Sequence, residues 1–238
     1  MLSASTQSRT ADELIGAWVL VGTPDKVGKI PASGGRMKFF TGQSFCVTQA
    51  DPKRGVVIYH HGGTYTVNGD EYVETVAYAN PTTMSFIGGT NGHFHIKIKG
   101  DTMTLIGIGN PWKEVWKRAD KPARGGSQAA KDLIGVWAYA GAADGDGKVP
   151  ERNIGFKFIT GSDWCDTQAD SKSGIVMAHH GGTWSFQGDK YIESVKYANP
   201  GTLPFIGHDF KFDWKVDGDT LTLKGIGNPW NEIWKRVK

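Results

Sequence analysis

The sequence HHGGTYTVNGDEYVETVAYANP, residues 60–81, is the most informative part of the chain because it occurs twice. Its second copy, HHGGTWSFQGDKYIESVKYANP, occupies residues 179–200, which is 119 residues further on (60 to 179). In both copies apolar and polar residues alternate on each side of a Gly-Asp pair, a pattern typical of two β-strands joined by a tight turn. The chain is therefore a tandem duplication built around this hairpin.

The repeat extends over nearly all of the 238 residues and predicts two domains of about 110 residues each. We expect a flexible tail at 1–9, a first domain at 10–119, a polar linker at 120–129 and a second domain at 130–238. Each copy contains about eight short strands, so we predict an all-β fold of two tandem up-and-down antiparallel β-barrels. Closure would remove the sheet edges. A β-sandwich is the alternative, because periodicity alone does not separate the two.

Composition and cysteine usage restrict the function classes. The net charge is +3 and the chain has no basic run, so we expect no nucleic-acid partner. No apolar run approaches membrane-spanning length, so we expect no membrane contact. Cys46 and Cys165 occupy equivalent positions, and a bridge between equivalent sites of separate domains is not expected, which predicts reduced thiols. Residues 1–9 lack the apolar core of a signal peptide, and together these features favour the cytoplasm.

Two short signatures suggest a fold family. The segment Gly-Ala-Trp at 16–18, with Arg118 at the end of the last strand, recurs as Gly-Val-Trp at 135–137 with Arg236. These residues resemble the calycin/lipocalin signature, and the wider pattern resembles small bacterial lipocalin-like domains of otherwise unassigned function. The resemblance implies that each Trp closes one end of a barrel and that the Arg stacks across it as a cation–π contact.

The hairpin also carries the candidate site. Because side chains alternate between the faces of a strand, one His of each His-His pair should point into the barrel and His60 and His179 should point outward. The candidate acid–base residues expected in the interiors are His61, Glu74 and Tyr78 in the first copy and His180, Glu193 and Tyr197 in the second. The candidate ligand-binding aromatic residues are Tyr65, Tyr72 and Trp112 in the first copy and Trp184, Tyr191 and Trp230 in the second.

Three functions remain open. The first is a binding protein that holds a small apolar or aromatic molecule in a barrel cavity, with the interior polar groups binding its polar end. The second is a cofactor-independent isomerase, lyase or dehydratase, in which the His–Glu couple moves a proton and a Tyr hydroxyl stabilises an oxyanion. The third is a structural or interaction module whose interior polar groups form a hydrogen-bonded network. We predict neither a metal nor a cofactor, and a homodimer is possible.

The two copies differ in interior bulk. The second carries larger aromatic residues at four positions, namely Trp164, Trp184, Phe186 and Trp214 in place of Phe45, Tyr65, Val67 and Ile96. We therefore predict that the second barrel is the more filled and that the first holds the pocket. The Gly62-Gly63 pair and its repeat should mark a bend or β-bulge where the strand coils to close the barrel.

Overall fold

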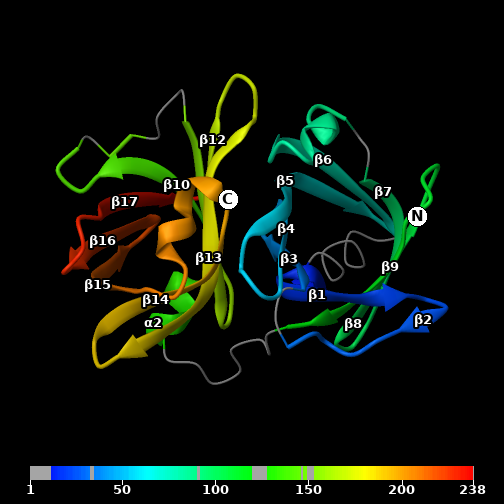
Figure 1. Ribbon diagram of the computed structural model, residues 1–238, viewed down its shortest axis with the longest axis horizontal. Helices are drawn as coiled ribbons and strands as arrows, with labels where there is room; N and C mark the ends of the chain where they lie inside the picture. Colours follow the sequence, from blue (N-terminus) through cyan, green and yellow to red (C-terminus); the bar gives the residue numbers. More distant parts are fainter. Residues whose placement is uncertain are drawn as a thin grey trace.

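The chain folds into two closed antiparallel barrels that lie side by side (Figure 1). The structure is a computed structural model and describes residues 12–32, 35–89, 92–119, 128–145, 147–148 and 153–237. Each barrel has eight strands, so the predicted fold class is confirmed. The expected tail at 1–9 and most of the expected linker at 120–129 lie outside the described residues.

Barrel 1 consists of β1 and β3–β9 and closes where β1 pairs with β9; the short strand β2 pairs only with β1. Its elements are β1 (Gly16–Thr23), β2 (Lys26–Val27), β3 (Arg36–Thr41), β4 (Ser44–Ala50), β5 (Val57–Asn68), β6 (Glu71–Ala79), the 3₁₀-helix η1 (Met84–Phe86), β7 (Gly92–Lys99), β8 (Thr102–Gly107) and β9 (Lys113–Arg118).

Barrel 2 repeats this topology and closes where β10 pairs with β17. Its elements are the helix α2 (Gln128–Leu133), β10 (Gly135–Ala142), β11 (Asn153–Ile159), β12 (Asp163–Asp170), β13 (Val176–Gln187), β14 (Lys190–Ala198), the 3₁₀-helix η2 (Pro200–Phe205), β15 (Asp209–Asp217), β16 (Thr220–Ile226) and β17 (Asn231–Arg236).

One end of each barrel is closed by a tryptophan and an arginine. The guanidinium carbon of Arg118 lies 4.2 Å from the ring centroid of Trp18, and that of Arg236 lies 4.0 Å from Trp137. The indole nitrogen of Trp18 also donates to the Leu14 carbonyl at 2.7 Å. This is the arrangement that the signature implied. We call the opposite end of each barrel, where β1 or β10 finishes and β9 or β17 begins, the mouth.

The barrels pack against each other through the outward faces of their central strands. Two equivalent main-chain hydrogen bonds join the barrels. Ala79 N of barrel 1 donates to Gly174 O of barrel 2 at 2.9 Å, and Ala198 N of barrel 2 donates to Gly55 O of barrel 1 at 3.0 Å. Between these bonds lies a third apolar cluster, separate from the two barrel interiors. Its buried members are Ala17, Phe39, Cys46, Ala50, Val57, Tyr78, Val136, Phe158, Cys165, Ala169, Val176 and Tyr197. The arrangement is that of a two-fold dimer contained in one chain.

His60 and His179 meet in the middle of this interface. They point out of their barrels as predicted, but they are fully buried because the other barrel covers them. Their rings stack with centroids 3.6 Å apart. Each ring is hydrogen-bonded to a threonine of the other barrel. His60 Nε2 lies 3.1 Å from Thr167 Oγ1, and His179 Nε2 lies 3.0 Å from Thr48 Oγ1. The interface is therefore hydrogen-bonded as well as apolar.

The cysteines occupy the same interface. Cys46 and Cys165 are both free thiols, as predicted, but their sulfur atoms lie 3.3 Å apart. The two thiols are thus unbridged, as expected, although the equivalent sites of the two domains lie next to each other. The equivalent residues meet because the face that carries them is the one through which the barrels pack.

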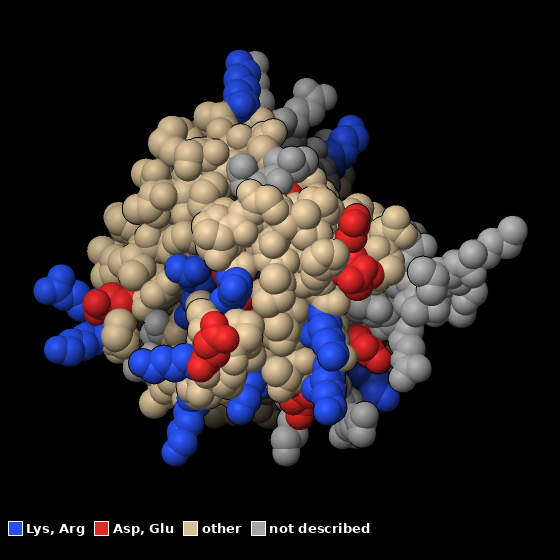
Figure 2. Space-filling view, turned by 90° about the vertical axis from the view of Figure 1, so that its right-hand side faces the viewer, with Lys and Arg blue, Asp and Glu red and all other residues tan. Residues whose placement is uncertain are grey.

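On the face of barrel 1 shown in Figure 2, charged side chains of both signs gather mainly in the lower half, and the upper half is largely uncharged except for Lys or Arg side chains at its edge. In the part of the chain that the structure describes, no helix has the length and apolar character needed to cross a membrane.

Candidate functional site: the barrel interiors

A β-bulge positions the candidate residues of each hairpin. Gly62 pairs with Tyr78 but Gly63 pairs with Val76, so one residue of β6 is extra, and β13–β14 repeat the same shift. Glycine is required here because a Cβ on Gly63 would collide with the Thr75 carbonyl oxygen. The predicted bulge is thus present. It reverses the alternation of side chains beyond it, since a shift of one residue exchanges the two faces of a strand.

Because of the bulge, two candidate residues lie outside the barrels and not inside them as predicted. Tyr78 and Tyr197 were expected inside the barrels, but both lie in the cluster between the barrels. The Tyr78 ring stacks on Phe156 with centroids 5.8 Å apart, and the Tyr197 ring lies 5.7 Å from His179. Neither tyrosine lines a barrel cavity.

The other candidate acid–base residues do face the interiors, and each glutamate is paired with a buried lysine. Lys38 Nζ lies 2.5 Å from Glu74 Oε1, and Lys157 Nζ lies 2.7 Å from Glu193 Oε1. A tyrosine hydroxyl donates to each of these carboxylates, from Tyr72 at 2.6 Å and from Tyr191 at 3.0 Å. Tyr72 and Tyr191 were expected to bind ligand, but their hydroxyl groups are hydrogen-bonded to the glutamates.

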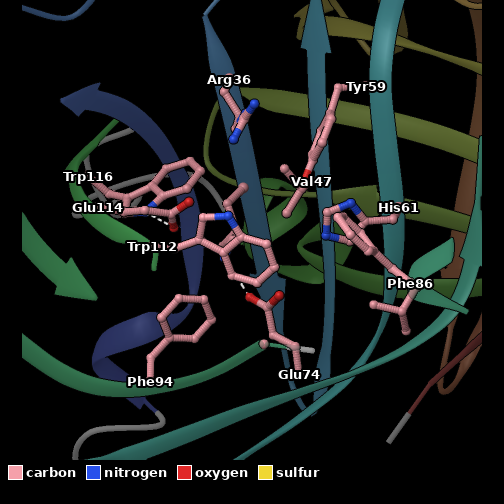
Figure 3. Close-up of a pocket in the computed structure, with 13 residues that line it drawn as sticks. Arg36, Val47, Tyr59, His61, Glu74, Phe86, Phe94, Trp112, Glu114 and Trp116 are labelled. Atoms are coloured by element: carbon pink, nitrogen blue, oxygen red, sulfur yellow. Dashed lines mark hydrogen bonds and ion pairs between the residues drawn. The ribbon is translucent and has the colours of Figure 1, made fainter. Parts of the chain in front are cut away.

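Barrel 1 is filled at its mouth by Arg36 and Tyr59. The Arg36 guanidinium carbon lies 4.2 Å from the centroid of the Tyr59 ring. Figure 3 shows both side chains at the upper edge of the pocket, with Trp112 in the middle of the view, Glu114 to its left and Glu74 below it. The remaining cavity measures about 40 Å³, which has room for water but not for an organic ligand.

Barrel 2 is open at the same place because its sequence differs at these two positions. Gly155 stands where barrel 1 has Arg36, and Ala178 stands where it has Tyr59. The cavity measures about 440 Å³, within the range of small-molecule sites. The prediction that barrel 1 holds the larger pocket is therefore wrong.

The extra aromatic bulk of barrel 2 lies away from its mouth. Trp184 and Trp214 both pack on Phe186, with ring centroids 5.5 and 5.4 Å apart. Trp184 also donates to the Thr160 carbonyl in the turn between β11 and β12 at 3.0 Å. These rings fill the half of the barrel near Trp137, so they take no room from the cavity. Tyr65 occupies the corresponding half of barrel 1 and donates to Gly42 O at 2.7 Å.

Two groups of residues define the barrel 2 cavity. The aromatic rim consists of Phe205, Phe210 and Trp230, with the Phe210 and Trp230 rings 4.4 Å apart and edge-on. The predicted ligand platform Trp230 is thus at the mouth, as is Trp112 in barrel 1. The polar cluster consists of Lys157, Asp166, Glu193 and Glu232.

Burial and mutual proximity shift the protonation of the polar cluster. Burial raises the pKa of Asp166 to about 8 although Lys157 opposes the shift. Burial likewise raises the pKa of Glu193, again against Lys157. Burial alone would lower the pKa of Lys157, but Glu193, Glu232 and Asp166 together raise it above its ordinary value. Lys157 is therefore charged at neutral pH, and Asp166 is mainly a neutral carboxylic acid that can donate a hydrogen bond.

His180 lies in the wall of the same cavity. Burial, with the charge of Lys157 added, lowers its pKa to about 3, so the ring is neutral at physiological pH. Its Nδ1 is buried and has no hydrogen-bond partner among the described residues, and the same holds for His61 in barrel 1. The Phe205 ring contacts His180 edge-on with centroids 5.3 Å apart.

Several site residues were missed from the sequence. Lys38 and Lys157 follow the alternation that places Phe40 inside barrel 1, but lysine is rarely found inside a protein unless it is paired. Asp166 was missed because barrel 1 has Val47 at that position. The signal was available in both cases, since strand alternation puts Lys157 and Asp166 on the inward face.

Comparisons with known proteins identify no relative. No family model matches the chain and no curated protein matches it. Among solved structures, the β subunit of DNA polymerase III from Thermotoga maritima is 9% identical, with a TM-score of 0.15, and the match covers 94% of this chain and 56% of that one. A Helicobacter pylori β clamp in complex with Carprofen is 10% identical, with a TM-score of 0.16, and the match covers 92% of this chain and 55% of that one.

A second Helicobacter pylori β clamp structure, bound to a DNA ligase peptide, is 10% identical with a TM-score of 0.15, and the match covers 97% of this chain and 64% of that one. The chain thus spans less than two thirds of each of these three proteins. At TM-scores this low the likeness says nothing about the fold or function of this chain.

Proposed function

We propose that the protein binds a small organic molecule in the cavity of barrel 2, and that barrel 1 is a closed copy with a supporting role. The observation that carries the proposal is the combination of a cavity of about 440 Å³, an aromatic rim and a polar cluster of which all members but the half-buried Glu232 are buried. Small-molecule sites characteristically join a largely apolar lining to a few convergent polar groups. The apolar part of the ligand would lie against the rim and its polar end would meet the cluster.

The proposal extends to the fold family. Two closed eight-stranded barrels and the stacked pairs Trp18–Arg118 and Trp137–Arg236 support a calycin-like assignment. Such barrels enclose room for one small ligand when the interior is not filled by side chains. Barrel 1 corresponds to the filled case, because Arg36 and Tyr59 occupy its mouth.

One observation favours a second candidate, a cofactor-independent enzyme. Asp166 has a pKa of about 8, raised mainly by burial, and lines the cavity together with His180. A carboxyl group that titrates near the working pH is suited to general acid–base chemistry. The Asp166→Asn variant would separate the two functions, because it would abolish turnover while leaving a neutral ligand bound.

The binding function is tested by filling the cavity. The Ala178→Tyr variant places in barrel 2 the ring that Tyr59 supplies in barrel 1, and Met177→Tyr is the matched control because Met177 is exposed on the outer face of the same strand. Native mass spectrometry and thermal shift would be run with a panel of small aromatic compounds of mixed charge. We expect the wild type and Met177→Tyr to bind members of the panel and Ala178→Tyr to lose them. Equal behaviour of all three proteins would overturn the proposal.

A further inference from the structure

The two barrel interiors differ in charge. Around the barrel 1 cavity two cations, Arg36 and Lys38, face two carboxylates, Glu74 and Glu114. Around the barrel 2 cavity the only cation among the described residues is Lys157, and it faces the three carboxyl groups of the polar cluster. The formal balance is therefore zero in barrel 1, whereas barrel 2 has one cation and three acids. An uncompensated carboxylate is costly in a buried site, and without a further cation the cluster avoids part of that cost by keeping a proton on Asp166.

The duplication shows what occupies the equivalent space when it is filled. In barrel 1 the Arg36 guanidinium is stacked on the Tyr59 ring and its Nε donates to Gln49 Oε1 at 3.0 Å, while the charges of Glu114 and Glu74 act on the Tyr59 hydroxyl. In barrel 2 the counterpart residues are Gly155 and Ala178, so the chain does not supply the planar cation. A ring reaches the cavity wall from a different position, because Tyr139 stands where barrel 1 has Leu20. Barrel 1 thus holds, on its own side chains, a planar cation and an aromatic group that the barrel 2 cavity has room to accept.

The rim of barrel 2 is suited to the same chemistry. The ring of Trp230 lies edge-on to Phe210 at 4.4 Å and to Phe205 at 5.2 Å between centroids. Three rings at a mouth next to carboxyl groups favour a cation that also has an apolar part, because aromatic faces attract cations. The buried Nδ1 of His180 offers a further polar contact within the cavity wall.

We propose that the barrel 2 cavity binds a planar organic monocation, such as an aryl amidinium, an aryl guanidinium or a protonated amino-heterocycle. Its nitrogen atoms would face Asp166 and Glu232, and its aryl part would lie among Phe205, Phe210 and Trp230. This inference rests on the proposed binding function and specifies the class of ligand.

Binding of such a cation should depend on pH. The groups that face Asp166 are Tyr139 on β10, Lys157 on β11, His180 on β13, Glu193 on β14 and Glu232 on β17. His180 is neutral and Lys157 charged throughout the range from pH 6 to 9, and Asp166 ionises within it. Because a cation stabilises the carboxylate, affinity should rise as the pH increases through about 8.

The test compares three probes of one shape, which are benzamidine, benzamide and benzoate, by titration calorimetry on the full chain. We expect benzamidine to bind at least about tenfold more tightly than benzamide, and benzoate to show no binding. At pH 9, where Asp166 is ionised, the preference for benzamidine should fall about tenfold in Asp166→Asn and Glu232→Gln, whereas the surface variant Asp217→Asn, which removes one carboxylate from an exposed site, should retain it.

The outcomes separate the two proposals. Benzamide binding as tightly as benzamidine would overturn the cation class and leave the binding function intact. A benzamidine preference that survives both cavity variants, with each variant shown to be folded by circular dichroism, would overturn the placement at Asp166 and Glu232. If none of the three probes binds, the cation class is overturned, and the mixed-charge panel with Ala178→Tyr then decides the binding function on its own.

Discussion

Buried lysines are the least expected residues of these barrels. Lys38 and Lys157 are 3% and 2% exposed, and lysine is almost never so buried unless it is paired. Each is held by a glutamate and lies near tryptophan rings, with Lys38 Nζ 5.0 Å from Trp116 and Lys157 Nζ 5.1 Å from Trp234. The interior of each barrel is thus organised around an ion pair.

Removing one partner of this pair should be costly. Glu74→Gln keeps the size of the side chain and the acceptor for Tyr72 but leaves Lys38 without its countercharge. We expect a loss of about 3–5 kcal/mol in the free energy of unfolding, measured by urea denaturation. The control is Glu71→Gln on the same strand, where the side chain is 52% exposed. A Glu74→Gln protein as stable as this control would show that the pair does not support barrel 1.

The buried histidines predict a sharp loss of stability in acid. Burial lowers the pKa of His60 and His180 to about 3 and that of His61 and His179 well below the ordinary value. A histidine in the unfolded chain has a pKa of about 6.5, so between pH 3 and 6.5 the unfolded chain binds more protons than the folded protein. Stability should therefore be fully present above pH 6.5 and fall as the pH decreases toward 3.

The variant His61→Phe measures how much one of these histidines contributes to the pH dependence of stability. His61 Nδ1 has no partner among the described residues and its ring packs on Phe45, Tyr59 and Phe86, so Phe should fit. The slope of stability against pH should decrease by up to about 1.4 kcal/mol per pH unit in the acid range. The exposed His95→Gln serves as control and should keep the wild-type slope. An unchanged slope in His61→Phe would contradict the assignment of this histidine as a buried neutral base.

At this scale the sequence predicted some residues and not others. Strand alternation correctly placed His61, His180, Glu74 and Glu193 inside the barrels. It failed at Tyr78 and its repeat because the extra residue of a bulge reverses the faces of a strand, and the sequence does not show which residue is extra. Lys157 and Asp166 were missed because burial of a charge depends on a partner from another strand.

The interior and the interface both depend on strands β5 and β13, whose paired glycines lie opposite the bulges of β6 and β14. A Cβ on Gly182 would collide with the main-chain oxygen of Ser194 on the neighbouring strand. We expect Gly182→Ala to lower the free energy of unfolding of barrel 2 by about 2–4 kcal/mol, since the backbone must shift to relieve the contact. The matched control is Thr183→Ala, an exposed position next to it. Equal stability of the two variants in urea would show that the glycine is not required.

The hairpins and the closed barrels were predictable because alternation and turn residues report directly on strands. The location of the cavity was not, because the residues compared in the sequence lie in the half of the barrel near Trp137. The residues that decide it, Gly155 and Ala178 against Arg36 and Tyr59, were recognisable as cavity-forming only after the register placed them at the mouth. Volume at one end of a barrel says nothing about volume at the other.

At the scale of the whole molecule, the interface between the barrels was hidden in the sequence. Phe39, Cys46 and Phe158 point out of their barrels but are fully or almost fully buried. Strands such as β4 are apolar on both faces, which is the signal of a sheet covered on both sides. The signal could not say what covers the outer face, because a second chain would give the same pattern.

The two thiols provide a probe of this interface. Cys46 and Cys165 are fully buried between the barrels, so a disulfide reagent should label them only when the barrels separate or unfold. We expect labelling to be slow in buffer and to accelerate with urea. A cysteine introduced at the exposed Ser185 should react at once and serves as control. Labelling of the native thiols at the rate of Ser185→Cys would show that the barrels do not stay packed.

The pairing of two barrels within one chain has a consequence for how the copies can change. In a dimer of identical chains every substitution appears in both partners, so opening one mouth would open the other, and an interface residue could be altered only together with its symmetry mate. Covalent fusion removes that restriction while keeping the same interface. One copy can retain Arg36 and Tyr59 and remain a rigid platform, and the other can lose both side chains. The asymmetry of the two mouths is a freedom that duplication within a single chain provides.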